Sequence, residues 1–272
     1  MSVGDARAWF ETHGATLVLA QSSVSEFVPV DETDKLRIRG ELQLLEEFPV
    51  AYIRLGDIQC RELEGAVKAF NAGGEPQPLD PYVSHFWRTF WDVEPKTFHD
   101  VLITQEIERR VNFRLHDQVL MLWTNRVNFQ NRPELTVGVQ RILNAIRDNS
   151  QTAEEKFSAE VPDALNACDC LPADSPGLEG WLRSTPSIAP AWRLHYEVLQ
   201  EWAANTTDNA KAGDLHDVVH LFAVPYVEYA TLDRRFVDYA SRATKRLRQI
   251  DGSIDYDSRI FRSFGDIMKA IS

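Results

Sequence analysis

Short apolar runs lie near both ends of the chain, and segments with helical spacing follow them. The runs Thr16–Ala20, Val50–Leu55 and Tyr226–Leu232 have the length and composition of buried strands. Helical patterns follow the second and third runs, at Gly56–Phe70 and Arg234–Arg248. This alternation predicts an α/β fold whose core contains a parallel sheet.

The middle of the chain has a different character, because helical patterns fill it. A turn-rich segment after Gly73 precedes these helices, and a second proline-rich break ends before the helix Ala191–Ala204. We therefore expect a core built from residues 1–72 and 191–272, with a mostly helical insertion at 73–190. The helices predicted within the insertion are Asp100–Asn112, Leu115–Arg126, Glu134–Ser150 and Thr152–Glu160.

Acidic residues gather in the segment Gly213–Tyr239 near the end of the chain. Asp214 and Asp217 are three residues apart, so they share one side of a predicted helix. Asp233 directly follows the apolar run 226–232 and thus stands at a strand's carboxyl end, where open α/β sheets bind ligands. Because Mg²⁺ and Mn²⁺ prefer carboxylate oxygens, the spacing predicts that Asp217 and Asp233 hold one divalent cation, with Asp214 as a further candidate ligand.

A second interpretation of these acids is structural, and the sequence leaves it open. Asp214 and Asp233 each precede a predicted helix, which is the position of an N-cap residue. His216 and His220 have the i, i+4 spacing of a zinc pair, but no pair of cysteines accompanies them. We therefore expect His220 to pack near the acids rather than to bind zinc.

This segment resembles the carboxyl half of PIN-like nuclease domains. In that family a helix with a D-x-x-H arrangement precedes a strand that ends in an acid, and Asp217 with His220 matches the helix. The residues Thr231–Asp233 match the end of the strand. Upstream, Glu26 follows a strand and a serine-rich turn within Ala15–Phe27, as a glutamate of the family does.

The resemblance implies a metal-dependent nuclease that hydrolyses RNA phosphodiesters. Glu26, Asp217 and Asp233 would be catalytic, and together with Asp214 they would hold Mg²⁺ or Mn²⁺. The family also opens with a strand that ends in an aspartate, and nothing before Ala15 matches that first strand and first aspartate. Two alternatives therefore stay open, a catalytically inactive PIN-like interaction protein and a small-phosphate-ester hydrolase.

The distribution of charge bears on the substrate. A net charge of -12 argues against broad, nonspecific nucleic-acid binding, because Lys and Arg make most contacts to phosphates. Arg234 and Arg235 directly follow Asp233 and, with Arg193 on the helix Ala191–Ala204, are the candidate contacts for a phosphate. The alternative is that basic residues of the helix after Asp233 only balance its dipole.

The remaining patterns concern location and partners. No apolar run in the sequence is long enough to span a bilayer and no signal-peptide pattern is present, so we expect a cytoplasmic protein without membrane contact. Cys60, Cys168 and Cys170 are expected to be reduced thiols. Glu62 and Glu64 are expected to be solvated. A protein partner or a homo-oligomer is compatible with the acidic composition.

Overall fold

The computed structural model describes residues 3–20, 23, 34–83, 115, 133–170, 177–211 and 213–271. The chain divides into two compact units. The first comprises residues 1–56 and 81–132, and the second comprises residues 57–80 and 133–272. These bounds differ from the expected ones, because the helix after the second strand belongs with the C-terminal half of the chain.

The first unit contains a small mixed sheet. The strand β1 (Leu17–Leu19) pairs in parallel with β2 (Val50–Ile53), and β2 pairs in antiparallel with β3 (Tyr82–Val83). The two strands expected near the N-terminus are thus confirmed as a parallel pair. The helices described in this unit are α1 (Val3–His13) and α3 (Asp34–Leu45). Its buried cluster consists of Leu19, Ile38, Leu42 and Leu115.

Helices dominate the second unit. Its two strands, β4 (Ala230–Thr231) and β5 (Ile260–Phe261), pair in parallel. The α-helices described in this unit are α4 (Ile58–Ala72), α7 (Pro133–Asp148), α8 (Ala153–Ala167), α9 (Leu178–Ser184), α10 (Pro190–Ala204), α11 (Asp214–His220), α12 (Arg234–Ile250) and α13 (Phe264–Ile271). Two short 3-10 helices are also present, η2 (Pro186–Ile188) and η3 (Leu221–Tyr226).

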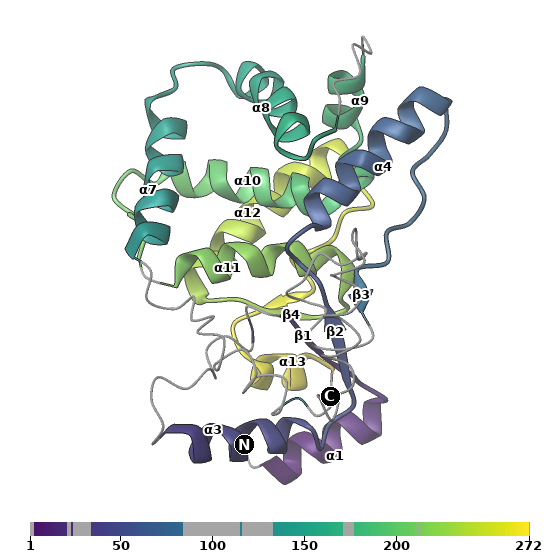
Figure 1. Ribbon diagram of the computed structural model, residues 1–272, viewed down its shortest axis with the longest axis vertical. Helices are drawn as coiled ribbons and strands as arrows, with labels where there is room; N and C mark the ends of the chain where they lie inside the picture. Colours follow the sequence, from purple (N-terminus) through teal and green to yellow (C-terminus); the bar gives the residue numbers. More distant parts are fainter. Residues whose placement is uncertain are drawn as a thin grey trace, which may run out of the picture. The chain divides into compact units, whose positions relative to one another are not determined.

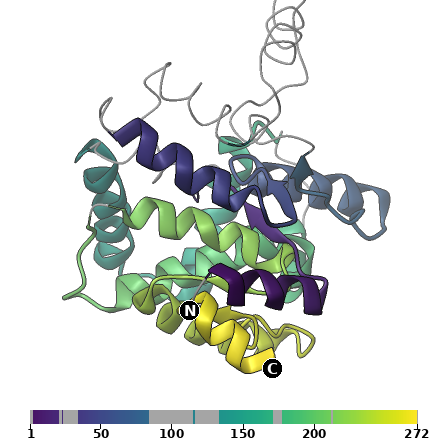
Figure 2. The same cartoon turned by 90° about the horizontal axis from the view of Figure 1, so that it is seen from below.

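The largest buried apolar cluster of the second unit forms where α10 and α12 pack together (Figures 1 and 2). On α12 the buried residues Phe236, Ala240, Ala243 and Leu247 recur every three or four positions, so they form one apolar side. Trp202 of α10 meets Phe236 edge to face, with ring centroids 5.2 Å apart. This packing fixes the first turn of α12, which carries the predicted arginines.

The strand before Asp233 is shorter than the sequence predicts. Residues Leu221–Tyr226 continue α11 as the 3-10 helix η3, and only Ala230 and Thr231 pair as β4. Pro225 lies inside η3. Because proline has no N–H to donate, it does not support a regular α-helix there, and the tighter 3-10 turns carry the chain to its strand.

The helices expected at Glu134–Ser150, Thr152–Glu160 and Ala191–Ala204 are confirmed as α7, α8 and α10. Those expected at 100–112 and 115–126 lie outside the described residues, apart from Leu115. The described residues are therefore α/β, mostly helical with small and mostly parallel sheets, which agrees with the expected class. None of the helices described here combines the length and the apolarity needed to cross a membrane.

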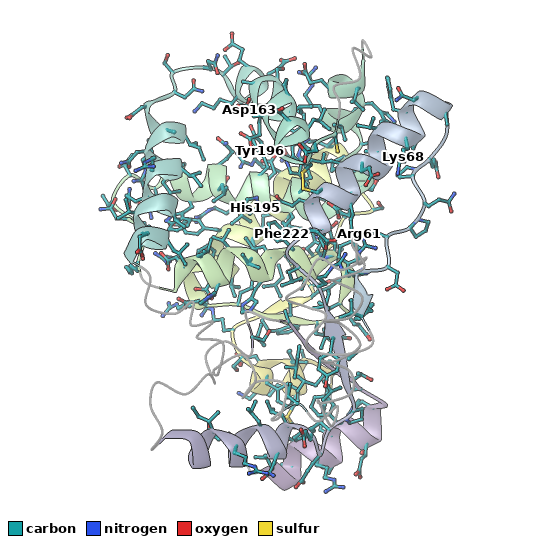
Figure 3. The ribbon with its side chains drawn as sticks, in the orientation of Figure 1. Arg61, Lys68, Asp163, His195, Tyr196 and Phe222 are labelled. Carbon is teal, nitrogen blue, oxygen red and sulfur yellow. A yellow bond between two sulfur atoms is a disulfide. The ribbon has the colours of Figure 1, made fainter. Side chains whose placement is uncertain are left out.

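A disulfide joins α4 to the end of α8, between Cys60 and Cys168 (Figure 3). The expectation of reduced thiols is therefore wrong for these two cysteines. Cys170 is a free and buried thiol, and burial raises its pKa. The disulfide attaches α4 to a helix that lies far along the chain, within the second unit.

Candidate functional site

The residues Asp233, Arg234 and Arg235 line one pocket of about 540 Å³ at the start of α12. The volume lies in the range of small-ligand sites. The pocket lies entirely within the second unit. Its other lining residues come from the loop after α10 and from the same side of α12, and they are Asn205, Thr207, Asp208, Asp238, Tyr239 and Arg242.

Arg235 is held in place by two carboxylates. Its guanidinium donates to Asp208 Oδ1 at 2.9 Å and to Asp214 Oδ1. Asp214 is only 4% exposed, and its second oxygen accepts the backbone N–H of Lys211 at 2.6 Å. Burial raises the pKa of Asp214, against the opposing effect of these two donors. Both oxygens of this predicted metal ligand are therefore already bound within the protein.

A tyrosine completes the anchoring of Asp208. The Tyr239 hydroxyl donates to Asp208 Oδ2 at 2.6 Å and accepts from Asn205 Nδ2 at 3.1 Å. Burial and the adjacent Asp208 raise the pKa of Tyr239 to about 12. Burial alone would raise the pKa of Asp208, but the hydrogen bonds from Tyr239 and Arg235 outweigh it and lower that pKa. The pocket wall is thus a connected network of hydrogen bonds.

Asp233 and Arg234 have no such partners. Both are exposed, and neither side chain forms a hydrogen bond or ion pair within the described part of the chain. Asp233 occupies the N-cap position of α12, yet its carboxylate makes no capping hydrogen bond. An unpaired carboxylate and an unpaired guanidinium therefore stand next to each other at one pocket, available to a ligand.

The other charged residues of the pocket are engaged at its rim. Arg242 donates to Glu201 at 2.8 Å, and Asp238 accepts from Arg262 at 3.2 Å. These ion pairs are exposed, so each contributes little to stability. Arg242, eight residues after Arg234, belongs to the basic residues expected on this helix, whereas Asp238 was not singled out from the sequence although it lies four residues after Arg234 on the same side of the helix. The spacing was a usable signal for them, whereas Asp208 comes from a loop and no helical pattern reveals it.

The structure places other predicted residues elsewhere. Arg193 is 4% exposed and pairs with Glu197, at 3.0 Å, so its guanidinium is used inside the protein rather than at the pocket. Burial lowers the pKa of Arg193. Asp217 lies on α11, partly exposed, and is not among the residues that line the pocket. Glu26 lies outside the described residues.

His220, which we expect to pack near the acids, lies at the end of α11. Burial, with a smaller effect of His216, lowers the pKa of His220 to about 4. In the part of the chain that the structure describes, no group of three or more His, Cys, Asp or Glu side chains is arranged to hold a metal ion. A metal bound at the pocket would therefore rely on one or two of the described carboxylates and on other ligands.

A second polar cluster surrounds Glu62, which the sequence analysis placed in solvent. That expectation is wrong, because Glu62 is 4% exposed. Its carboxylate accepts the backbone N–H groups of Ala191 and Trp192, each at 2.9 Å, and the hydroxyl of Tyr226. Burial raises the pKa of Glu62 to about 7, although all three hydrogen bonds oppose this rise.

The sequence did contain a signal for this burial. Ile58, Glu62, Ala66 and Ala69 recur every three or four residues, and all four are buried along one side of α4. One helical turn before Glu62, Gln59 Nε2 lies 3.0 Å from Nδ1 of His195. The residues that surround Glu62 come from more than a hundred positions away, so only the fold reveals them.

His195 is the second titratable group of this region. Its ring lies 4.8 Å from that of Phe222, and both are labelled in Figure 3 beside the packed helices. Burial lowers the pKa of His195 to about 4, so the ring is neutral at neutral pH. His195 is thus a neutral packing residue of α10 next to Gln59. It does not line the Asp233 pocket, so it has no part in that site.

Comparisons of the chain with protein-family models, with curated proteins and with solved structures give no match. The functional interpretation therefore depends on the geometry of the pocket. That geometry offers one unpaired carboxylate for a cation and one unpaired guanidinium for an anion, next to an arginine that is fixed by two aspartates.

Proposed function

We propose that the chain is a metal-dependent nuclease of the PIN-like type, which hydrolyses RNA phosphodiesters at the pocket beside the first turn of α12. The observation that supports this most is that Asp233 and Arg234 lie side by side at one pocket, and neither side chain pairs with another described residue. A carboxylate suits a hard divalent cation, and a guanidinium suits a phosphate oxygen. A phosphodiester with its associated cation would engage both groups at once.

Arg234 is the phosphate contact in this proposal. It stands in the first turn of a 17-residue helix, where the helix dipole also favours an anion. Arg235 adds positive charge to the same wall, but Asp208 and Asp214 hold its guanidinium, so its role is to stabilise the pocket. Arg193 has no part, because it is buried against Glu197.

Asp233 is the metal ligand that the geometry supports best. Mg²⁺ usually binds through one or two carboxylates, with water and substrate phosphate as further ligands, so the donor chemistry fits Mg²⁺ or Mn²⁺. Asp214 is a weak second candidate, because both of its oxygens are already bound. Asp217 is the second ligand that the family resemblance implies. Glu26 is the additional ligand that the family resemblance implies. The ion would lower the pKa of a bound water and stabilise the departing oxygen.

One observation favours a second candidate, a PIN-like protein that binds a partner without catalysis. The ion pair between Asp214 and Arg235 neutralises one of the acids that the resemblance assigns to the metal. Fewer carboxylates weaken the affinity for a divalent cation. The two candidates differ in whether Mn²⁺ binding and RNA cleavage depend on the same side chain.

The test is calorimetric titration of Mn²⁺ together with cleavage of a labelled single-stranded RNA. Asp233→Asn is compared with Asp163→Asn, which removes the same charge from an exposed position on α8. We expect the first variant to lose at least tenfold in both Mn²⁺ affinity and cleavage rate, and the second to match the parent. Parent-like binding and cleavage in Asp233→Asn would refute the assignment.

Two further measurements separate the alternatives. Turnover of a small aryl phosphate ester without RNA cleavage would assign the chain to the phosphate-ester hydrolases. Absence of turnover and of Mn²⁺ binding in the parent protein would favour the non-catalytic candidate. Parallel titrations of Asp214→Asn and Asp217→Asn decide between the two acids of α11, and we expect only Asp217→Asn to weaken Mn²⁺ binding.

A further inference from the structure

A second pocket of about 610 Å³ lies in the same unit and shares no residue with the first. It forms between the end of η3, the segment before β4, the strand β5 and the end of α13. Its lining residues are Pro225, Tyr226, Val227, Glu228, Tyr229, Ser258, Arg259, Phe261, Ala270 and Ile271. The lining combines aromatic rings, one cation and several hydrogen-bond acceptors, and the proposed nuclease function uses none of them.

Two aromatic rings form part of the wall. Tyr229 directly precedes β4, and Phe261 stands on β5 opposite Thr231. Their ring centroids are 6.0 Å apart with an interplanar angle of 62°, which is an edge-to-face contact. Such a contact covers one ring face with the edge of the other ring and leaves ring surface for a third aromatic group. Stacking of a planar ligand on such rings is a common mode of nucleobase binding.

Arg259 is the cation of the pocket. It is partly exposed, and its charge acts on the nearby Tyr229 and Asp255, but its side chain forms no hydrogen bond or ion pair with the described residues. Neighbouring arginines differ, because Arg248 pairs with Asp255 and Asp257, and Arg262 pairs with Asp238. An unpaired guanidinium at a pocket can bind a phosphate through two parallel hydrogen bonds.

The polar groups around the rings are mainly acceptors. The Tyr226 hydroxyl donates to the buried Glu62, and the Ser258 hydroxyl donates to the carbonyl of Asp255 at 3.1 Å. With its proton committed, the Ser258 oxygen can still accept a hydrogen bond. Glu228 adds an exposed carboxylate. A ligand ring that carries N–H donors therefore suits the pocket better than a hydrocarbon ring.

We infer that this pocket binds a nucleoside monophosphate, with the base against Tyr229 and Phe261 and the phosphate on Arg259. The pocket has a volume typical of small-ligand sites, which agrees with a ligand of this size. The inference does not depend on nuclease activity, because the two pockets have separate lining residues. A free mononucleotide and the terminal nucleotide of an oligonucleotide share this chemistry, and the experiment separates them.

The experiment is calorimetric titration of the full chain with AMP, CMP, adenosine and an RNA tetranucleotide. We expect AMP and CMP to bind, and Arg259→Gln to weaken AMP binding at least tenfold while it leaves adenosine binding within twofold of the parent. Tyr229→Leu should weaken both AMP and adenosine, because it removes ring surface. The tetranucleotide is expected to bind no more tightly than AMP.

Control variants make the outcome specific to this pocket. Arg262→Gln removes an exposed arginine three residues further along the chain, and we expect it to leave AMP binding unchanged. Equal weakening by Arg262→Gln would mean a nonspecific charge effect and would overturn the inference. Three other results would also overturn the inference. These are loss of AMP binding in the double variant Asp233→Asn/Arg234→Gln, binding of the tetranucleotide but not of AMP, and no binding of any of these ligands by the parent. Circular dichroism of each variant verifies its fold.

Discussion

The carboxylate of Glu62 lies 2.9 Å from the backbone nitrogen of Trp192, so a side chain of α4 caps the first turn of α10. The neighbouring N–H of Ala191 binds the same carboxylate. Helix N-termini leave backbone donors unsatisfied, and a residue of the adjoining chain usually accepts from them. Here the cap comes from 130 positions away, which ties the start of α10 to the tertiary structure.

Stability should respond to the protonation of Glu62. Its pKa is raised from 4.5 to about 7 in the folded protein, mainly by burial. The folded state therefore binds the proton more tightly, and the stabilising contribution is complete below about pH 4.5 and is lost as the pH rises through about 7. Across this window we expect the group to change the free energy of unfolding by roughly 3 kcal/mol.

The measurement is urea unfolding of the parent and of Glu62→Gln at several pH values between 4 and 8. Glutamine does not titrate, so the difference between the two proteins should change steadily across the window. Glu64→Gln is the control, because Glu64 is exposed and forms an ion pair with the exposed Lys68. A difference curve for Glu62→Gln as flat as that of Glu64→Gln would contradict the prediction.

His195 should give the opposite pH dependence. Burial lowers its pKa from 6.5 to about 4, so the unfolded state binds the proton more tightly. The stabilising contribution is present above about pH 6.5 and is lost as the pH falls toward 4. We expect the parent to lose on the order of 2 kcal/mol of unfolding free energy through this group as the pH falls, and His195→Gln to lack that loss. Thermal unfolding at pH 4.5 and 7.5 tests this, with the exposed His13→Gln expected to behave as the parent.

The ion pairs of Arg235 should contribute far more to the free energy of unfolding than the side chain of its neighbour Arg234. Removing Arg235 leaves Asp208 and the buried Asp214 without their counter-charge, and broken buried pairs cost roughly 3–5 kcal/mol. Arg234 is exposed and unpaired, so we expect Arg234→Gln to change stability by less than about 0.5 kcal/mol. Chemical unfolding of both variants gives the comparison. Equal losses in the two would mean that the network does not hold α12 in place.

The disulfide should contribute a large share of the stability of the second unit. Cys60 and Cys168 are 108 positions apart, and in the chain-entropy model a closed loop of that length contributes about 4–5 kcal/mol. We expect a reductant to lower the melting temperature of the parent and to have no effect on Cys60→Ser/Cys168→Ser. Cys170→Ser should keep the response of the parent, because Cys170 is not part of the disulfide. A parent that melts identically with and without reductant would exclude the disulfide in solution.

Local patterns predict those elements that depend on neighbours in sequence. The apolar runs at β1 and β2 and the periodicity of α7, α8, α10 and α12 were sufficient to locate them. The strand before Asp233 is shorter than expected, because Tyr226 ends η3 and only Ala230 and Thr231 of the apolar run pair with β5. Short apolar runs do not separate a strand from a short helical segment.

Helix packing accounts for the errors at the candidate site, because it decides which side chains are buried. Asp214 has the spacing of a metal ligand, yet Arg235 from another helix neutralises it. An arginine is usually exposed at the protein surface, yet Arg193 is buried in the core, where it pairs with Glu197. The pairing of Arg193 with Glu197 follows from their i, i+4 spacing on α10, but its burial depends on which helices pack together, as does the pairing of Asp214 with Arg235. Asp233 and Arg234 line one pocket, since adjacent residues at a helix start share a location in any fold.

The position of α4 has a consequence for how the protein is made. Ribosomes synthesise a chain from its N-terminus, so α4 emerges before every helix against which it packs in the second unit. The partners of Cys60 and Glu62 follow 108 to 164 residues later. Until then the apolar side of α4 and its carboxyl group have no native contacts, and such non-local contacts slow folding. The second unit therefore cannot complete the packing of α4 until α8, α10 and η3 have been synthesised.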